Sequence, residues 1–340
     1  MGRFLLHGLC IAGLAIGLTG LTLAQEVTRM RLSHWAPAGH AMSVYLDEWA
    51  NELEAASNGQ LRIDVFPGGQ LGSVSDHYDM VRRGVVDIGW ILHGETSDRF
   101  PLTGLIDIPF TVDSALHGTR VLNDPELRRR FLDAEHRGLR VLYLFTHQPA
   151  QIHTADKAVT TPADLIGQRI RFPSATAREF LDQLGADSVG LPPSEIAEAM
   201  QRKVVDGVII DYGGAGIAFQ LGGLVGHVAE VNAYVTSFGI VMNPRTWDRL
   251  PGDLQSLISQ SLDGIEEKVG AIWDGLDAPG KQALIAGGAV VHVPDGAAVD
   301  QFRAVGADVA EAVLAQREAA GSNARAAYDL MLELAARYRE

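Results

Sequence analysis

A short segment that occurs twice constrains the fold of this 340-residue chain more than any other feature. Residues 75–87 align without a gap on residues 194–206, and both copies share a first serine, two acids, an arginine and a final Val-Val-Asp. In both copies a helical pattern leads into a strand pattern. The repeat therefore predicts two related α/β lobes. The alternative is a chance similarity between two helix-to-strand transitions.

The size and charge of the chain agree with such a fold and exclude some partners. A chain of 340 residues can form two domains of ordinary size. Its 47% hydrophobic and 21% charged residues are typical of globular proteins. The formal net charge of −14 disfavours nucleic acid or an anionic membrane surface as the main partner.

Residues 1–24 have the features of a secretory signal peptide. Arg3 is their only charge, and the uncharged run 9–23 is shorter than the roughly 20 residues that span a bilayer. Small residues precede the expected cleavage site after Ala24. We therefore expect export to the periplasm of a mature chain without cysteine, because Cys10 is the only one. That chain has neither disulfides nor thiolate metal sites. A retained membrane anchor is the alternative.

The strand and helix patterns alternate through most of the chain. A first strand, 30–35, delivers His34 and Trp35 to a loop, where α/β sheets bind ligands. The uninterrupted apolar run 141–145 predicts a central parallel strand covered on both faces. We place a crossing between the lobes directly after it. Segments 228–234 and 237–243 are expected to return the chain to the first lobe.

The C-terminal part is predicted to be mainly helical. A helix of roughly 25 residues or more, from Gly252 past Trp273, is long enough to lie across both lobes. The predicted domains are a signal peptide and two discontinuous lobes. Their ranges are 1–24 for the signal peptide, 25–148 with about 237–276 for lobe I, and 149–236 with about 277–340 for lobe II.

A guanidinium lies within a buried-strand pattern in the stretch 161–174, TPADLIGQRIRFPS. In the strand 169–172 the side chains alternate, so Ile170 and Phe172 face a core while the two arginines point the other way. Ser174 can cap the next helix. A cation at a strand end, just before a helix N-terminus, is well placed to hold a carboxylate. The commoner alternative for Arg171 is a surface ion pair.

Motifs for covalent, metal or nucleotide chemistry are absent from the sequence. It contains no G-x-S-x-G, H-E-x-x-H, Walker or G-x-G-x-x-G motif, and the histidines lack metal-ligand spacing. We therefore predict no enzyme activity, no metal and no cofactor, and we interpret His147 and His153 as scaffold residues. What remains is a polar and aromatic set at predicted strand ends, suited to binding a small carboxylate without transforming it. The set is Trp35, Trp90, His93, Gln151, Arg171, Ser174 and Tyr212. For each aromatic residue, a place in the core is the alternative.

Four separated motifs together resemble a known family. In chain order they are FPGGQLGSVSDHYDMVRRGVVDIGW, ADLIGQRIRFPS, SEIAEAMQRKVVDGVII and VTSFGIVMNPRTWDRLP. From about Thr28 to the C-terminus the chain resembles the periplasmic solute-binding proteins of tripartite ATP-independent periplasmic (TRAP) transporters, the DctP family. The resemblance implies an α/β fold of the two-lobed periplasmic binding protein type (class II-like). Its mixed sheets are flanked by helices, and a long helix bridges both lobes.

The resemblance also implies how the ligand is held. The family arginine that grips a substrate carboxylate corresponds to Arg171. Ile210 replaces a familiar asparagine, which argues against a sialic-acid-like, highly polar ligand. Gln151 stands where some members carry a second arginine, which argues against a second carboxylate. We therefore expect a monocarboxylate with an apolar or aromatic body, held against Trp35, Trp90 and Tyr212.

As for partners, the resemblance implies delivery of the acid to the TRAP membrane permease subunits by a protein expected to be a monomer. The soluble chain then needs neither ATP nor metal. Two alternatives remain open at this point. One is the ligand-binding partner of a periplasmic sensor. The other is a periplasmic enzyme on the same fold, for which His147 is the nearest candidate base.

Overall fold

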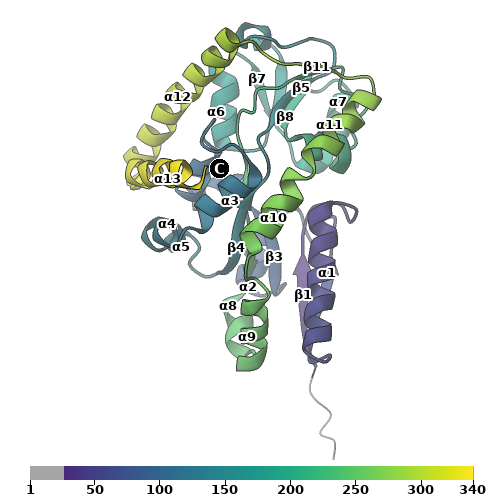
Figure 1. The fold of residues 1–340 in the computed structure, drawn as a ribbon, viewed down its shortest axis with the longest axis vertical. Helices are drawn as coiled ribbons and strands as arrows, with labels where there is room; N and C mark the ends of the chain where they lie inside the picture. Colours follow the sequence, from purple (N-terminus) through teal and green to yellow (C-terminus); the bar gives the residue numbers. More distant parts are fainter. Residues whose placement is uncertain (1–26, 340) are drawn as a thin grey trace, which may run out of the picture.

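In a computed structural model, which describes residues 27–339, the chain forms two mixed β-sheets, one in each lobe (Figure 1). The predicted signal peptide lies outside the described residues. In lobe I the sheet order is β2-β1-β3-β10-β4, and in lobe II it is β11-β9-β5-β8-β6-β7. The strands of lobe I are β1 (Thr28–Ser33), β2 (Leu61–Phe66), β3 (Ile88–Leu92), β4 (Arg140–Thr146) and β10 (Ser237–Met242). Those of lobe II are β5 (Gln151–Thr154), β6 (Arg169–Phe172), β7 (Asp187–Gly190), β8 (Gly207–Ile210), β9 (His227–Ala229) and β11 (Val290–His292). The predicted two-lobed α/β fold is confirmed.

The chain crosses between the sheets in two extended segments. Residues 147–150 lead from β4 in lobe I to β5 in lobe II, and residues 230–236 lead from β9 back to β10. Strand β10 runs antiparallel to both β3 and β4, and β5 runs antiparallel to both β8 and β9. These two segments connect the sheets, and the lobe ranges given from the sequence stay a prediction.

The repeated segment forms the same local structure in both lobes. In lobe I, α2 (His77–Arg83) leads into β3, and in lobe II, α7 (Ile196–Gln201) leads into β8. The shared aspartates make equivalent hydrogen bonds. Asp87 accepts one from the backbone N–H of Arg31 (2.8 Å), and Asp206 accepts one from the backbone N–H of Arg169 (2.9 Å). Each carboxylate thus ties its unit to the neighbouring parallel strand, β1 or β6.

The run of chain that bridges the lobes is divided into separate helices, contrary to the single helix predicted from Gly252 past Trp273. The structure has α9 (Gly252–Gln260), α10 (Ile265–Asp274) and α11 (Asp277–Ala286). Gly264, in the left-handed region at φ 70°, interrupts the helical hydrogen bonds before α10. Helix α10 packs on lobe I and α11 packs on η7 (Gly214–Ala218) of lobe II, so the run still passes from one lobe to the other (Figure 1).

Strand β4 occupies the edge of its sheet and pairs antiparallel with β10, so the prediction of a central parallel strand was wrong. Tyr143, Leu144 and Phe145 are nevertheless all buried, and helices α3 (Ala115–Asn123) and α10 pack against the strand. An uninterrupted apolar run reports burial on both faces, but it does not report strand direction or position.

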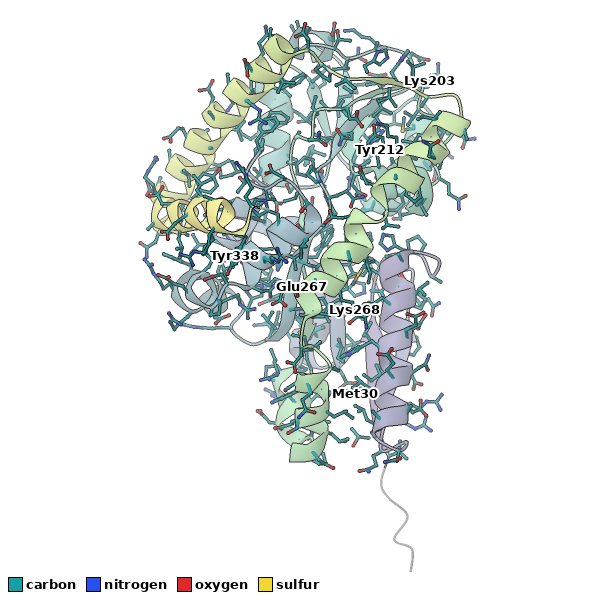
Figure 2. All side chains as sticks on the ribbon, viewed as in Figure 1. Met30, Lys203, Tyr212, Glu267, Lys268 and Tyr338 are labelled. Atoms are coloured by element: carbon teal, nitrogen blue, oxygen red, sulfur yellow. The ribbon has the colours of Figure 1, made fainter. Side chains whose placement is uncertain are left out.

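The remaining helices cover the sheets and join the lobes. Helix α1 (Ala41–Ala56) ends before Asn58 and Gly59, which both have a positive φ, a backbone conformation that ends many helices. The long helix α12 (Gly296–Ala319) packs on α6 (Ala175–Gln183), whereas α13 (Ala324–Tyr338) packs on α3 (Figures 1 and 2). The shorter helical segments include η1 (Val74–Asp76), η2 (His93–Arg99), η3 (Thr103–Asp107), α4 (Pro125–Leu127), α5 (Asp133–Glu135), η5 (Pro162–Leu165), η6 (Pro193–Glu195) and α8 (Pro244–Arg249). No helix within residues 27–339 is long and apolar enough to cross a bilayer.

Candidate ligand-binding site

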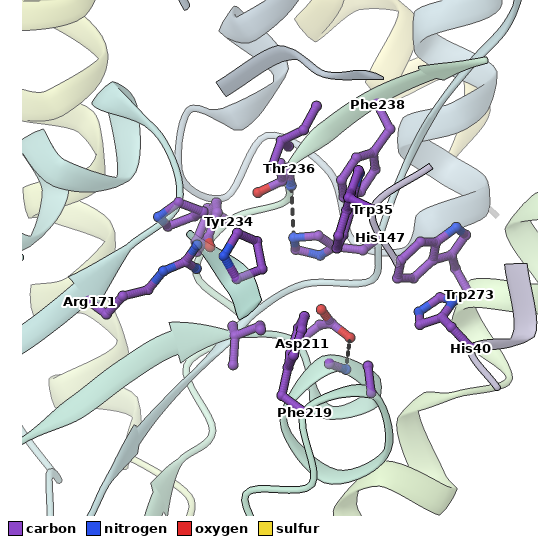
Figure 3. Close-up of a pocket in the computed structure, with 16 residues that line it drawn as sticks. Trp35, His40, His147, Arg171, Asp211, Phe219, Tyr234, Thr236, Phe238 and Trp273 are labelled. Atoms are coloured by element: carbon purple, nitrogen blue, oxygen red, sulfur yellow. Dashed lines mark hydrogen bonds between the residues drawn. The ribbon is translucent and has the colours of Figure 1, made fainter. Parts of the chain in front are cut away.

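A pocket lies where the two lobes meet (Figure 3). It contains about 480 Å³ of space free of protein atoms, counting the part open to solvent. Segments far apart in the sequence supply its lining. The lining residues are Trp35, His40, Leu92, His147, Arg171, Pro173, Pro193, Ile210, Asp211, Gly214, Ala218, Phe219, Tyr234, Thr236, Phe238 and Trp273.

Arg171 enters the pocket from β6 with part of its guanidinium unused. The side chain is 1% exposed, and its Nε donates to the carbonyl oxygen of Leu191 at 2.9 Å. One terminal nitrogen, Nη2, is buried without a hydrogen-bond partner among the described residues. Burial lowers the pKa of Arg171 to about 10, so the group is still cationic at neutral pH. A buried donor without a partner is costly, and an anionic ligand would supply the missing acceptor.

The neighbouring arginine on the same strand behaves in the opposite way. The side chain of Arg169 is 43% exposed and forms an ion pair with Asp206, at 2.5 Å from Nη2 to Oδ1. The surface ion pair that was the alternative for Arg171 is thus found at Arg169. Ile170 and Arg171 are both buried, so β6 is covered on both faces at this point of the strand.

Aromatic rings from lobe I form one wall of the pocket. Phe238 stacks on Trp273 with ring planes 9° apart and centroids 5.6 Å apart, and Trp35 stacks on Phe238 at 6.1 Å. Trp90 is fully buried behind them, with its ring centroid 4.9 Å from that of Trp35. Rings held by such a packed cluster offer a fixed surface on which a planar group can stack.

Two histidines of the pocket have tautomers fixed by backbone N–H groups. His147 Nε2 accepts from the N–H of Thr236 (3.1 Å), so Nδ1 is the donor and bonds to the carbonyl of Gln148. With both ring nitrogens occupied, His147 is a structural residue, as the sequence interpretation proposed. His40 caps α1 through Nδ1, which accepts from Met42 N–H (3.1 Å), so its Nε2 carries the proton when the ring is neutral. Burial lowers the pKa of His147, and it lowers that of His40 to about 4.

Asp211 is a charged pocket residue that the sequence interpretation missed. It follows the last residue of β8, and its Oδ1 accepts from the N–H of Gly214 at 2.7 Å. A side chain at Gly214 would place its Cβ 2.9 Å from Asp211 Oδ2, so glycine is needed here. The prediction chose Tyr212, one residue further on, as an aromatic residue at the end of a predicted strand.

Four predicted site residues do not line the pocket. The Tyr212 hydroxyl donates to Glu230 (3.1 Å), and the ring packs in the core of lobe II beside α11 (Figure 2). The Gln151 side chain is hydrogen-bonded to Asn232, donating to its Oδ1 at 2.6 Å and accepting from its backbone N–H at 3.0 Å. Both residues hold the scaffold in place.

The other two of these four residues have equally definite structural partners. His93 and His136 share a hydrogen bond of 3.1 Å between their Nε2 atoms. Ser174 caps α6, with its hydroxyl accepting from the N–H of Ala177 at 3.3 Å. Of the seven predicted residues, Trp35 and Arg171 line the pocket and Trp90 supports its wall. The aromatic residues that were missed, Phe238 and Trp273, belong to elements that reach the pocket only through tertiary packing.

Within residues 27–339, no group of three or more His, Cys, Asp or Glu side chains could hold a metal ion.

Comparison with known proteins identifies the family. The family model for bacterial extracellular solute-binding proteins, family 7 (DctP), matches residues 32–316. A solute-binding protein of Roseobacter denitrificans is 26% identical over 270 residues, which cover 76% of this chain and 78% of that protein.

Two solved structures agree closely with the fold. A TRAP solute-binding protein from an unidentified marine microbe, described as specific for aromatic acid ligands, has a TM-score of 0.88 and 26% identity, covering 93% of this chain and 100% of the other. A TRAP solute-binding protein of Rhodoferax ferrireducens, solved with copurified benzoate, has a TM-score of 0.86 and 25% identity, covering 92% and 98%. The chain therefore belongs to the DctP family of periplasmic solute-binding proteins of TRAP transporters.

Proposed function

We propose that this protein captures a small aromatic monocarboxylate in the pocket between its lobes and delivers it to TRAP permease subunits in the membrane. The observation that carries the proposal is the partly unpaired guanidinium of Arg171 in a pocket with a wall of stacked rings. The guanidinium would hold the carboxylate, and the rings would hold the body of the acid.

The charges of the pocket favour one carboxylate over two. Among the described lining residues, Arg171 is the one lysine or arginine, while Asp211 adds a carboxyl group. A second ligand carboxylate would approach Asp211 without gaining a cation, and like charges at close range oppose binding.

Relatives with known ligands support the same class of acid. The marine protein was solved with metahydroxyphenylacetate, and the Rhodoferax ferrireducens protein with benzoate. A TRAP solute-binding protein of Bordetella bronchiseptica, at 25% identity and a TM-score of 0.82, was solved with both enantiomers of mandelate. All three ligands are aromatic monocarboxylates.

The proposed mechanism is capture and closure without chemistry. Arg171 belongs to lobe II and the aromatic wall to lobe I, so one ligand would contact both lobes and stabilise their closed arrangement. The segments 147–150 and 230–236 are the proposed hinge. His147, the nearest candidate base for an enzyme, has both ring nitrogens engaged by backbone groups. We place the capture step in the periplasm, after export by the predicted signal peptide, with the protein acting as a monomer.

Calorimetry with benzoate and phenylacetate on a chain starting at Gln25 tests the proposal. We expect both acids to bind, and Arg171→Met to weaken binding at least 100-fold, because a desolvated charge-assisted contact is lost. Arg169→Met is the matched control, since that arginine lies on the same strand and pairs with Asp206 outside the pocket, and it should bind like the parent. Binding by Arg171→Met at the parent affinity, with circular dichroism confirming a folded protein, would refute the proposal.

A further inference from the structure

Besides Arg171, the pocket holds a polar pair, Asp211 and His40, and nothing in the capture of a simple aromatic acid requires it. Figure 3 shows Arg171 and His40 at opposite sides of the pocket, with Asp211 between them. The space between Arg171 and His40 is lined mainly by rings and aliphatic side chains. Of the other polar lining residues, His147 has both ring nitrogens engaged and Thr236 has a hydroxyl group, so Asp211 and His40 are the carboxyl group and the ring donor that the far end of a ligand would meet.

Asp211 presents an acceptor without a partner. Its side chain is 3% exposed, and Oδ1 is occupied by the N–H of Gly214. No hydrogen bond or ion pair from residues 27–339 reaches Oδ2, although the carboxyl group lines the pocket. The absence of a side chain at Gly214 leaves the space that Oδ2 occupies, since a Cβ there would lie only 2.9 Å away. The backbone thus holds this carboxylate in place and leaves one oxygen for a ligand.

His40 presents a donor in the same pocket. Because Nδ1 accepts the N–H of Met42, the neutral ring has its proton on Nε2, and no described residue accepts from Nε2. Burial keeps the ring neutral at physiological pH, with a pKa of about 4, although the charge of Asp211 opposes this shift. The ring is fixed by packing on Trp273, with centroids 4.9 Å apart.

We propose that Asp211 and His40 form a hydroxyl-recognition subsite, so that the preferred ligand is an aromatic monocarboxylate bearing a neutral hydroxyl group on the part remote from its carboxylate. This inference rests on the proposed function and deepens it. A hydroxyl group both donates and accepts, so it satisfies Asp211 Oδ2 and His40 Nε2–H together. An ammonium group satisfies Asp211 alone, and a second carboxylate satisfies His40 alone while facing the Asp211 charge.

The site also predicts a penalty for ligands without the hydroxyl group. A plain aromatic acid would displace water from Asp211 and His40 without replacing its hydrogen bonds. Sites built to bond a ligand hydroxyl discriminate strongly against analogues that lack it, because buried polar groups are then left without partners. We therefore expect the best hydroxylated acid to bind at least 10-fold more tightly than its unsubstituted parent.

Paired ligands and three variants test the subsite by calorimetry. The ligands are benzoate with its 2-, 3- and 4-hydroxy derivatives, and phenylacetate with its 3- and 4-hydroxy derivatives. Asp211→Asn removes the charged acceptor at nearly constant shape. His40→Asn removes the Nε2 donor and keeps a residue type that caps helices well. Asp277→Asn is the control, because this half-buried acid interacts electrostatically with Asp211 but does not line the pocket.

The expected result is a hydroxyl preference of at least 10-fold in the parent, reduced to about one- to threefold in Asp211→Asn and His40→Asn, and retained in Asp277→Asn. Equal binding of all hydroxylated and plain acids by the parent protein would overturn the subsite, as would full retention of the preference in Asp211→Asn. Tighter binding of 3-(aminomethyl)benzoate than of every hydroxylated acid would also overturn it, by assigning Asp211 to a cation.

The two proposals fail in different ways. If benzoate binds and needs Arg171 but a hydroxyl group adds nothing, the subsite is wrong and the proposed function stands. If none of these acids binds the folded parent protein, the proposed function itself is wrong.

Discussion

The two lobes contribute different chemistry to one pocket. All five tryptophans of the chain belong to segments of lobe I, in or next to β1, α1, β3, α8 and α10. Lobe II instead contributes Arg171 from β6 and Asp211 from the end of β8. One lobe thus offers a fixed surface for stacking, and the other provides the charges that would orient a ligand. A ligand bound by both is held firmly only when the lobes are together.

The difference arises although the repeated segment has the same backbone arrangement in both lobes. In lobe I, β3 carries Trp90 into the aromatic core behind the pocket. In lobe II, the corresponding β8 ends at Ile210, and the next residue is Asp211. The aspartate of the shared Val-Val-Asp bonds each unit to its neighbouring strand. The residues that follow it determine which side chains the unit places in or behind the pocket. The fold and the chemistry of the site are therefore specified by different positions of the same segment.

Acidification is expected to have the largest effect, and it should destabilise lobe I more than lobe II. Burial lowers the pKa of three histidines in lobe I, His34, His40 and His136, to about 4. In lobe II it lowers the pKa of His153 to about 4. Between pH 6.5 and 4 the unfolded chain binds these protons and the folded chain does not, so the free energy of unfolding falls as the pH falls. Each histidine can contribute at most about 3 kcal/mol to this loss.

Buried acids act in the opposite direction and reduce the effect. Burial raises the pKa of Asp107 to about 7 and that of Asp277 to about 6, so the folded state binds their protons in the same pH range. Among the described residues, seven histidines with a lowered pKa stand against six acids with a raised pKa, so we expect a net loss of stability on acidification. Tryptophan fluorescence reports lobe I alone, and hydrogen exchange reports both lobes. We expect lobe I to lose protection first, and stability that stays constant or rises from pH 6.5 to 4.5 would contradict this expectation.

The stacking role of lobe I can be separated from the charge role of lobe II. Trp273→Leu removes a ring of the pocket wall and should weaken benzoate binding about 10-fold, since aromatic pairs contribute roughly 0.5–1.5 kcal/mol beyond area burial. Binding of cyclohexanecarboxylate, which keeps the carboxylate but is not planar, should change less. Trp247→Leu is the control, because this lobe I ring lies under Arg140, 3.5 Å from the guanidinium carbon to the ring centroid, and outside the pocket. An equal loss of affinity for benzoate and for cyclohexanecarboxylate would contradict a stacking role for Trp273.

The features that could be predicted from the sequence arise from local patterns, and the features that could not be predicted arise from tertiary contacts. Strand alternation and the helix-to-strand repeat are patterns within short segments, so they predicted the two-lobed α/β fold and the strand that carries Arg171. Local patterns do not show which side chains meet across elements, so His40, Phe238 and Trp273 were missed. They also fail where an element ends. The preference for an aromatic residue at a strand end chose Tyr212 over Asp211, and helical spacing gave no sign that Gly264 would take a positive φ.

The smallest predicted effect concerns the two aspartates of the repeat, and it tests whether the units are equivalent. Asp87→Ala and Asp206→Ala each remove an acceptor of a backbone N–H from a partly exposed position, at a cost of about 1 kcal/mol or slightly more. Asp206 also pairs with the Arg169 guanidinium, whereas Asp87 accepts from the Thr246 hydroxyl (2.8 Å).

Because the Arg169–Asp206 pair is substantially exposed, it should add no more than about 0.5–1 kcal/mol, and salt should screen that excess. Urea unfolding at low salt should therefore show Asp206→Ala as slightly the more destabilised variant, and the two should converge at about 0.5 M NaCl, where the Debye length is only a few ångströms. A gap that persists at high salt would mean that the lobes use the shared aspartate differently, and the equivalence of the two units would have to be given up.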